Sequence, residues 1–329
     1  MRCVILGAGL GTRMKPLTLK MPKPMLPIAN RPVLEHLINK VRNAGIKDIL
    51  INTYHLPGIM KSYFGDGKKF GVNITWREEE LLTGPAGALL NFKDILENDD
   101  SVLVLSGDGI HDIDLEKFIE EHKSKMVQLS VVMKEVSNPG RYGVAKVDSR
   151  NMIVDFVEKP PLPEESLGLV SCGVYCLDPK LIRGIPFGEI YDYSNLIEEL
   201  LSQEKSIYCY KTIDYWSDIG TPTTLLEANR DALLGKVNVK FPDTVIKGDI
   251  LVEKEVDIDS SVTITGKVLF GKGSKIGENV HIIGPTVIGA KSTIGNGSYI
   301  SNSVLLPESN IPANTVISGK IIDNSQVEE

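Results

Sequence analysis

The sequence has few of the residues that build nucleophilic or thiolate sites. Four cysteines are spread over 329 residues without a Cys-x-x-Cys pair, and none has a histidine close by in the chain. The five histidines are scattered and form no Ser/His/Asp or Cys/His grouping. We therefore expect reduced, buried thiols and no zinc site.

Long apolar runs are also missing. No run approaches the ~20 residues that a membrane-spanning helix needs. The first residues enter a strand pattern directly, without the apolar region and cleavage site of a secretory signal. With 42% hydrophobic and 24% charged residues, the composition is that of an ordinary soluble protein. We expect a cytoplasmic protein without a membrane partner.

Acidic residues are absent before Glu35, although the whole chain carries a net charge of −7. In this acid-free stretch, Gly7, Gly9 and Gly11 follow a short apolar strand, and the basic residues Arg13 and Lys23 come next among prolines. Glycine lets backbone amides approach a ligand closely, so the stretch is typical of a phosphate cradle. Local basic charge on an acidic protein indicates a polyphosphate ligand rather than a nucleic acid partner.

Two familiar phosphate motifs are excluded. The chain has no GxxxxGK[ST], and Thr12 stands where the dinucleotide fingerprint that begins at Gly7 needs Gly or Ala. The three glycines alone are equally compatible with an ordinary strand-to-helix turn whose basic neighbours are solvated.

The complete string is more specific. The pattern GxGxRxxPLTxxxPKPMLP, from Gly9 to Pro27, resembles the signature of the sugar-1-phosphate nucleotidylyltransferases, also called nucleotide-sugar pyrophosphorylases. The resemblance implies that a sugar 1-phosphate attacks the α-phosphorus of a nucleoside triphosphate and expels pyrophosphate. The nucleophile is already ionised, so the reaction needs positioning, charge neutralisation and a divalent metal rather than a general base.

The resemblance assigns roles in the opening stretch. It implies that Arg13 contacts the triphosphate and steadies the departing pyrophosphate, and that Lys23 lies near the sugar phosphate and the α-phosphate. We interpret Lys15 and Lys20 as solvated surface charges. The implied nucleotide-binding residues of this stretch are Leu6, Gly7, Ala8, Gly9, Gly11 and Thr12.

A metal site is implied at two aspartates. Asp108 follows the apolar run SVLVLS, where a lone Asp is more often a turn residue. The resemblance instead implies that Asp108 and Asp218 bind Mg²⁺, which prefers carboxylate oxygens. Asp114 is interpreted as a helix cap.

Base recognition is expected in the segment 79–88, EELLTGPAGA, which resembles a GTAGA-type loop of the family. Gly84 and Gly87 are the expected contacts. Pro85 stands where Thr is common and removes one backbone N–H. Without the resemblance, the segment reads as a loop that enters a helix.

Sugar recognition is expected at Gly143, Glu158 and Lys159, which match the family's YGV and FxEKP motifs. Glu158 would accept hydrogen bonds from sugar hydroxyls and Lys159 would pair with the sugar phosphate. The alternative is a Glu–Lys surface pair at a strand end. Ser171 stands near where relatives often have Asn, so the sugar is less well defined than the reaction.

Strands and helices alternate from residue 1 to 233, which favours an α/β fold. Strands are expected at 49–51, 72–76 and 101–105, and more closely spaced ones between 129 and 177 suggest a mixed sheet. We expect Asn30 to cap a helix that begins at Arg31–Pro32, and Ser194 to cap a later helix. The predicted class is a Rossmann-like mixed-sheet nucleotidyltransferase domain.

A period of six takes over in the second part of the chain. It predicts a C-terminal left-handed parallel β-helix of the hexapeptide-repeat type, with between three and four coils. The predicted division is 1–233 catalytic domain, 234–243 linker, 244–322 β-helix and 323–329 polar tail. The aliphatic or aromatic positions of the repeat are Ile246, Val252, Ile258, Ile264, Phe270, Ile276, Ile282, Ile288, Ile294, Ile300 and Leu306.

The motifs favour GTP and mannose 1-phosphate as substrates, with glucose-1-phosphate thymidylyl or uridylyl transfer as the alternative. A bifunctional enzyme whose β-helix uses His281 for acyl transfer, or a non-catalytic regulatory subunit, would also fit parts of the sequence. Retention of Arg13, Lys23, Asp108 and Asp218 together favours an active enzyme. We expect a homo-oligomer, assembled through the β-helix.

Overall fold

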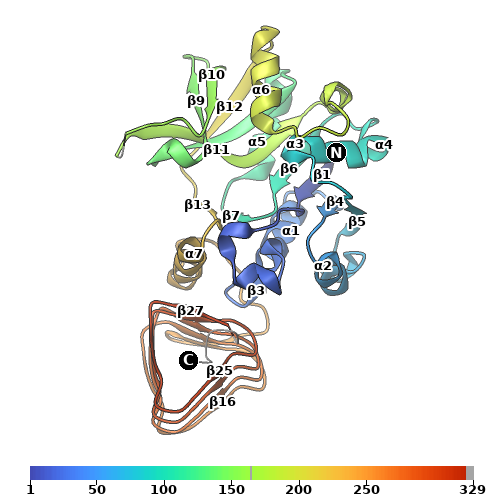
Figure 1. Ribbon diagram of the computed structural model, residues 1–329. Helices are drawn as coiled ribbons and strands as arrows, with labels where there is room; N and C mark the ends of the chain where they lie inside the picture. The colour runs from blue at the N-terminus through green and yellow to red at the C-terminus, as the bar shows by residue number, and fades with distance from the viewer. Residues whose placement is uncertain (164, 324–329) are drawn as a thin grey trace. The chain divides into compact units, whose positions relative to one another are not determined.

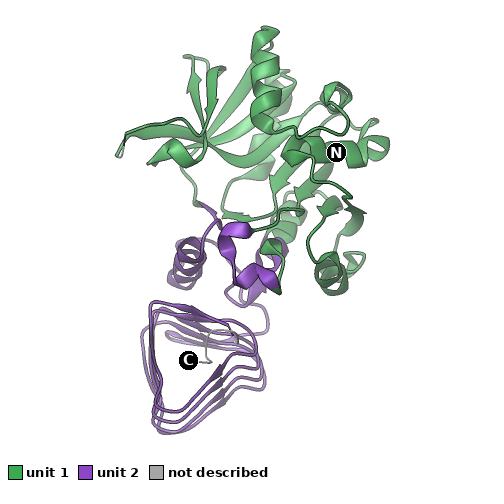
Figure 2. Ribbon diagram, in the orientation of Figure 1, with its two compact units in different colours: residues 1–11, 20–24, 37–216 green, residues 12–19, 25–36, 217–329 purple. Residues whose placement is uncertain are grey.

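A computed structural model describes residues 1–163 and 165–323 (Figure 1). Within these residues, no helix is long and apolar enough to cross a membrane. The chain divides into two compact units, coloured in Figure 2. Unit 1 consists of residues 1–11, 20–24 and 37–216, and unit 2 of residues 12–19, 25–36 and 217–329.

Unit 1 is built on a mixed sheet of nine strands. Its main path runs β10-β9-β11-β6-β1-β4-β5, and β8 joins β11 to β12. β1 is parallel to both β4 and β6, whereas β11 is antiparallel to β6. The predicted mixed-sheet α/β class is confirmed. The strands are β1 (Arg2–Leu6), β4 (Asp48–Thr53), β5 (Asn73–Glu78), β6 (Val102–Ser106), β8 (Leu129–Ser137), β9 (Gly143–Val147), β10 (Ile153–Glu158), β11 (Leu167–Leu177) and β12 (Ile207–Thr212).

The centre of this sheet is apolar on both faces. Val102 to Leu105 of β6 are fully buried, as are Cys3 to Ile5 of β1, which explains why both strands read as unbroken apolar runs. All four cysteines are free and buried, which confirms the expected thiols. Shorter strands are β2 (Pro27–Ile28), β3 (Arg31–Pro32), β7 (Gly109–His111) and β13 (Trp216–Asp218).

Helix caps confirm one prediction and correct another. Asp114 accepts a hydrogen bond from the Lys117 amide at 3.0 Å, as predicted for a cap. Ser194 is not the cap, because the N-cap lies two residues earlier at Asp192, which forms a reciprocal capping box with Asn195. The helices are α1 (Val33–Asn43), α2 (Pro57–Phe64), α3 (Gly84–Gly87), α4 (Lys93–Leu96), α5 (Leu115–Lys125), α6 (Tyr193–Ser202) and α7 (Pro222–Leu234). The 3₁₀ helices are η1 (Thr12–Met14), η2 (Leu17–Leu19), η3 (Lys23–Met25), η4 (Lys68–Phe70), η5 (Ala88–Phe92), η6 (Pro139–Arg141) and η7 (Pro179–Gly184).

The C-terminal part of unit 2 is a parallel β-helix, as predicted. Its strands stack into three sheets, and equivalent side chains such as Ile264, Ile282, Ile300 and Ile317 lie in register on successive turns. The strands are β14 (Val245–Lys247), β15 (Ile250–Val252), β16 (Asp257–Ile258), β17 (Thr263–Thr265), β18 (Val268–Phe270), β19 (Lys275–Ile276), β20 (His281–Ile283), β21 (Thr286–Ile288), β22 (Thr293–Ile294), β23 (Tyr299–Ser301), β24 (Val304–Leu305), β25 (Asn310–Ile311), β26 (Val316–Ser318) and β27 (Ile321–Ile322).

The predicted repeat is wrong at both ends. Leu305, not Leu306, pairs with Ile288 and enters the core, because this turn is one residue shorter than those before it. Ile246 is 60% exposed on β14, which runs antiparallel to β15 and so lies outside the parallel coils. Among the described residues, two of the sheets hold four strands each and the third holds five parallel strands, β15, β18, β21, β24 and β27, so the β-helix has slightly more than the predicted three to four coils.

The predicted helix start at Arg31–Pro32 is also wrong. Ala29 and Asn30 adopt left-handed backbone conformations (φ 50° and 61°) and turn the chain between β2 and β3. α1 therefore begins only at Val33. Apart from Asp323, the predicted polar tail lies outside the described residues.

Candidate active site

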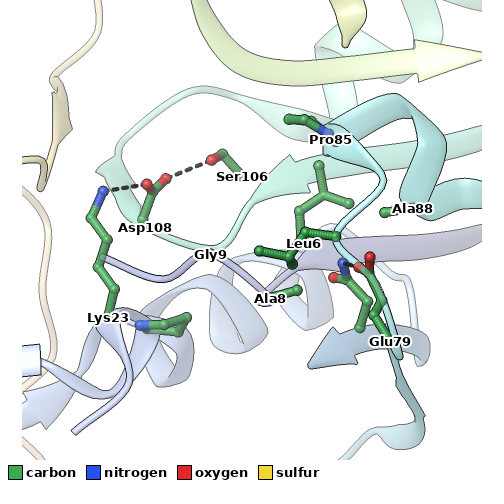
Figure 3. A pocket seen from close by; sticks show the side chains of 13 residues that line it. Leu6, Ala8, Gly9, Lys23, Glu79, Pro85, Ala88, Ser106 and Asp108 are labelled. Carbon is green, nitrogen blue, oxygen red and sulfur yellow. Dashed lines mark hydrogen bonds and ion pairs between the residues drawn. The ribbon is translucent and has the colours of Figure 1, made fainter. Parts of the chain in front are cut away.

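A pocket of ≈ 290 Å³ opens in unit 1 beside the loop that follows β1 (Figure 3). The carboxyl ends of β1 and β6 reach it, as expected for ligand sites in sheets of this kind. The pocket brings together residues that are far apart in sequence. It is lined by Leu6, Ala8, Gly9, Lys23, Pro24, Asn52, Glu79, Leu82, Gly84, Pro85, Ala88, Ser106 and Asp108.

The loop after β1 is held against β4. The Gly7 amide donates a hydrogen bond to Asn52 Oδ1 at 2.8 Å, and a Cβ on Gly7 would lie 2.9 Å from the Asn52 carbonyl oxygen. Glycine is therefore required at position 7 by the fold itself. At Gly9 a Cβ would meet nothing within 4 Å. The protein leaves this side of the Gly9 backbone open, beside the pocket.

Asp108 follows β6 and faces this loop. Its carboxylate forms an ion pair with Lys23 Nζ and accepts a hydrogen bond from Ser106 Oγ at 2.5 Å (Figure 3). Burial acts to raise the pKa of Asp108, but the Lys23 ammonium and the two hydrogen bonds outweigh it and hold the pKa below its usual value. Asp108 is therefore a carboxylate at neutral pH, not merely a turn residue.

A second carboxylate, Glu79, lies at the other end of the pocket lining. It is 6% exposed, and its Oε1 accepts a hydrogen bond from Asn52 Nδ2 while its Oε2 accepts a long one from the Thr83 amide at 3.4 Å. Because Asn52 Oδ1 is held by the Gly7 amide, the orientation of the Asn52 amide is fixed. No basic side chain of residues 1–163 and 165–323 forms an ion pair with Glu79. Buried carboxylates with spare acceptor capacity are costly without a ligand or donor.

The structure brings Gly84 to the pocket but not Gly87. Gly84 has φ +81°, and a Cβ there would lie 2.7 Å from Asp192 Oδ1, so the fold requires glycine. The Gly87 amide donates to the Tyr191 carbonyl at 2.9 Å and is thus already occupied. Pro85 lines the pocket with its ring.

Gly143, Glu158 and Lys159 lie outside this pocket lining. Gly143 on β9 pairs with Glu158 on β10, and Glu158 Oε1 lies 3.0 Å from Lys159 Nζ. Burial, and then the nearby Glu158 carboxylate, raise the pKa of Asp192. Because Asp192 Oδ1 would lie 2.7 Å from a Cβ built on Gly84, Asp192 stands close to both segments.

Arg13 and Asp218 come together in unit 2. A Cβ built on Gly220 would lie 2.9 Å from Asp218 Oδ2 and 3.3 Å from Arg13 Nη2, so both charged groups flank one backbone position. Arg13 belongs to η1, which Thr12 begins, and is exposed. The sequence analysis gives these two residues separate roles through the resemblance, Arg13 at the pyrophosphate and Asp218 at the metal.

Several pocket residues were missed in the sequence. Asn52 and Ser106 stand at the carboxyl ends of β4 and β6, a position that could have marked them, since ligands bind at that edge. Asp192, which lies outside the pocket lining, carries no such signal in the sequence.

The described residues contain no cluster of three or more His, Cys, Asp or Glu side chains that could hold a metal. Asp108 nevertheless fits a hard cation such as Mg²⁺, because it is an ionised oxygen donor beside a pocket and because Mg²⁺ takes few protein carboxylates and completes its shell with phosphates and water.

Comparison with known proteins agrees with this arrangement. Residues 2–234 match the family model described as nucleotidyl transferase, and residues 267–302 match the bacterial transferase hexapeptide model of six repeats. The chain belongs to the nucleotidyl transferase family and carries hexapeptide repeats C-terminal to the family domain.

The chain is similar to relatives whose names give different activities. The bifunctional protein GlmU of Methanocaldococcus jannaschii is 35% identical over 77% of this chain and 60% of its own length. The UTP–glucose-1-phosphate uridylyltransferase of Synechocystis sp. is 33% identical over 75% of this chain and 67% of its own length. The mannose-1-phosphate guanyltransferase of Candida albicans is 32% identical over 80% of this chain and 73% of its own length. The chain thus spans about three fifths to three quarters of the length of these relatives.

Among solved structures, a candidate glucose-1-phosphate thymidylyltransferase from Bacillus anthracis, in complex with sucrose, is similar to the chain. It has 29% sequence identity and a TM-score of 0.65, and the match covers 73% of this chain and 98% of that one.

Proposed function

We propose that this protein transfers a nucleotidyl group from a nucleoside triphosphate to a hexose 1-phosphate, with GTP and mannose 1-phosphate as substrates. The Lys23–Asp108 ion pair beside the glycine loop is the observation that carries the proposal. A fixed cation, an ionised carboxylate and backbone amides at one pocket edge suit the binding of phosphates.

The reaction follows from these groups. A phosphate oxygen of the sugar 1-phosphate attacks the α-phosphorus and forms a new P–O bond, while the bond from the α-phosphorus to the bridging oxygen breaks and pyrophosphate leaves with its electrons. Lys23 would neutralise charge around the α-phosphate and Arg13 would hold the departing pyrophosphate. Leu6 to Thr12 would bind the triphosphate along the backbone.

The proposal keeps Asp108 and Asp218 as ligands of Mg²⁺. When bound, Mg²⁺ would neutralise charge on the phosphates. Asp108 is supported by its ionised state and its place at the pocket, and Asp218 by its position beside Arg13 within unit 2.

Glu79 supports guanine as the base. A carboxylate only accepts hydrogen bonds, and guanine presents two adjacent donors, N1–H and the 2-amino group. Uracil and thymine present one N–H flanked by two carbonyl oxygens, which a carboxylate would repel. Gly84 would line the base site, whereas the amide of Gly87 is already used by Tyr191.

For the sugar, the proposal rests on Gly143, Glu158 and Lys159 and on the guanyltransferase relatives, whose names specify mannose 1-phosphate. Uridylyl or thymidylyl transfer to glucose 1-phosphate is the second candidate, because relatives with those names match 75% and 73% of the chain, nearly as much as the 80% that the guanyltransferase matches. A cytoplasmic location and a homo-oligomer assembled through the β-helix stay predictions.

The test is a grid of GTP, UTP, dTTP, ATP and CTP against mannose, glucose and N-acetylglucosamine 1-phosphates, with Mg²⁺ and pyrophosphate release as the readout. We expect the highest kcat/KM for GTP with mannose 1-phosphate. A preference for UTP or dTTP would contradict the base assignment and leave the reaction class intact. No release with any pair would contradict the function.

A further inference from the structure

Asn229 joins α7 to the hairpin formed by β2 and β3, and all three belong to unit 2. Its side chain is 1% exposed. Its Oδ1 accepts a hydrogen bond from the Ala29 amide at 2.9 Å, and its Nδ2 donates to the carbonyls of Pro27 and Leu225, each at 3.0 Å. Both N–H groups of this amide donate a hydrogen bond, and its oxygen accepts one. These three bonds fix the orientation of the amide.

The same helix carries the proposed pyrophosphate site at its start. Thr221 caps α7 and follows Gly220, the position that Arg13 and Asp218 flank. Asn229 lies about two turns further along, where α7 packs against β2. The residue just before the cap of α7, Gly220, thus lies beside the Arg13 guanidinium, and the helix itself packs against the hairpin.

The hairpin is in turn fixed to the β-helix. Asn30, at the turn, donates from Nδ2 to the carbonyl of Ile288 at 3.1 Å. That carbonyl also accepts from the Gly271 amide at 2.8 Å, within the coil ladder. Arg31 adds a hydrogen bond to the Pro242 carbonyl at 3.3 Å, in the linker that precedes the β-helix. These contacts agree with the grouping of residues 25–36 with the β-helix in Figure 2.

We propose that Asn30 and Asn229 are positioning residues through which the β-helix holds α7 and Arg13 in place for pyrophosphate. This inference rests on the proposed function. The β-helix then serves catalysis from within unit 2. A polar side chain that is buried with fixed partners defines one arrangement of the backbone, because any shift would leave an N–H or C=O unpaired.

The test uses the full-length chain in the reverse reaction, with GDP-mannose and inorganic pyrophosphate. Asn30→Gly removes the amide but keeps the left-handed turn, since glycine tolerates positive φ. Asn30→Asp keeps the shape but places a carboxylate against the Ile288 carbonyl. Asn229→Asp keeps the acceptor for Ala29 and loses both donated hydrogen bonds. Asn302→Gly is the matched control, because Asn302 is an exposed residue with φ 47° on a β-helix turn.

We expect the KM for pyrophosphate to rise about fivefold or more in Asn30→Asp and Asn229→Asp, and less in Asn30→Gly. The KM for GDP-mannose should stay within about twofold, because Glu158 and Lys159 belong to unit 1. Partial unfolding would lower the active fraction without changing either KM. A rise in the KM for pyrophosphate alone therefore identifies a positioning role.

An unchanged KM for pyrophosphate in all three variants, with an active wild type, would overturn this inference alone. A rise of the same size in the Asn302→Gly control would overturn it too. The wild type could also fail to form GTP from GDP-mannose and to form the corresponding triphosphate from any other nucleotide sugar. That result would overturn the proposed function and this inference together.

Discussion

The ammonium group of Lys23 lies against the carboxylate of Asp108, although 85 residues separate them in the chain. Lys23 is 6% exposed, and Asp108 stands at the carboxyl end of a central strand. A buried lysine is stable only where an anion compensates its charge. The pair therefore holds a cation and a carboxylate ready beside the glycine loop.

Replacing Lys23 by Met should remove the ammonium group and keep an unbranched apolar side chain of similar length. We expect kcat for nucleotidyl transfer to fall by about 10²–10³, the size of effect seen when one stabilising donor is lost. Lys20→Met is the control, since Lys20 is exposed in the same stretch. Steady-state pyrophosphate release measures both, and equal activity of the two variants would contradict the role of Lys23.

Asp108→Asn should weaken the dependence on Mg²⁺. An amide carries no charge, so we expect the half-saturating Mg²⁺ concentration to rise about tenfold or more, the usual scale for loss of a group that supports a metal. A Mg²⁺ titration of activity, with exposed Asp100→Asn as the control, provides the measurement. An unaltered titration curve would rule Asp108 out as a ligand.

Glu79→Gln should change the preferred base. A glutamine amide offers one donor and one acceptor, which suits uracil or thymine better than the two donors of guanine. We expect the ratio of kcat/KM for GTP to that for UTP to fall by about 10²-fold or more, because sites built on hydrogen bonds discriminate strongly. The exposed neighbour Glu80 gives the control Glu80→Gln, and a ratio that moves equally in both variants would refute the assignment.

His111 predicts a loss of stability in mild acid. Burial, and then the Lys40 ammonium, lower the pKa of His111 to about 3, and neither ring nitrogen has a partner among the described residues. The unfolded chain therefore takes up a proton below about pH 6.5 that the folded chain refuses. The contribution of His111 to the free energy of unfolding is fully present above pH 6.5 and decreases as the pH drops toward 3.

Between pH 6.5 and 5 we expect His111 to account for about 2 kcal/mol of lost unfolding free energy, from 1.4 kcal/mol per pH unit. His111→Leu should remove that part of the pH dependence in urea unfolding, whereas exposed His281→Leu should not. The same pH dependence in His111→Leu and in the wild type would contradict this account.

The sequence predicted what local pattern controls. Apolar runs of strand length placed Asp108 at a carboxyl end, and the period of six placed most of the β-helix core. The pattern failed where the deciding contact was distant. Asn30 looks like a helix cap, but its side chain reaches Ile288 instead, and its left-handed backbone forms a hairpin.

Distant contacts also decide the site. Whether an amide such as that of Gly87 is available depends on Tyr191, more than 100 residues away. The acceptor role of Glu79 depends on Asn52, which a different strand supplies. The shift from Leu306 to Leu305 depends on one turn of the β-helix being a residue shorter, which a strict period cannot foresee.

The most direct measurement is product formation by the full-length chain with GTP, mannose 1-phosphate and Mg²⁺. The account predicts pyrophosphate and a nucleotide sugar in equal amounts, strongly reduced in Asp108→Asn. Absence of both products with every nucleoside triphosphate and hexose 1-phosphate pair, in a protein that is folded, would contradict it.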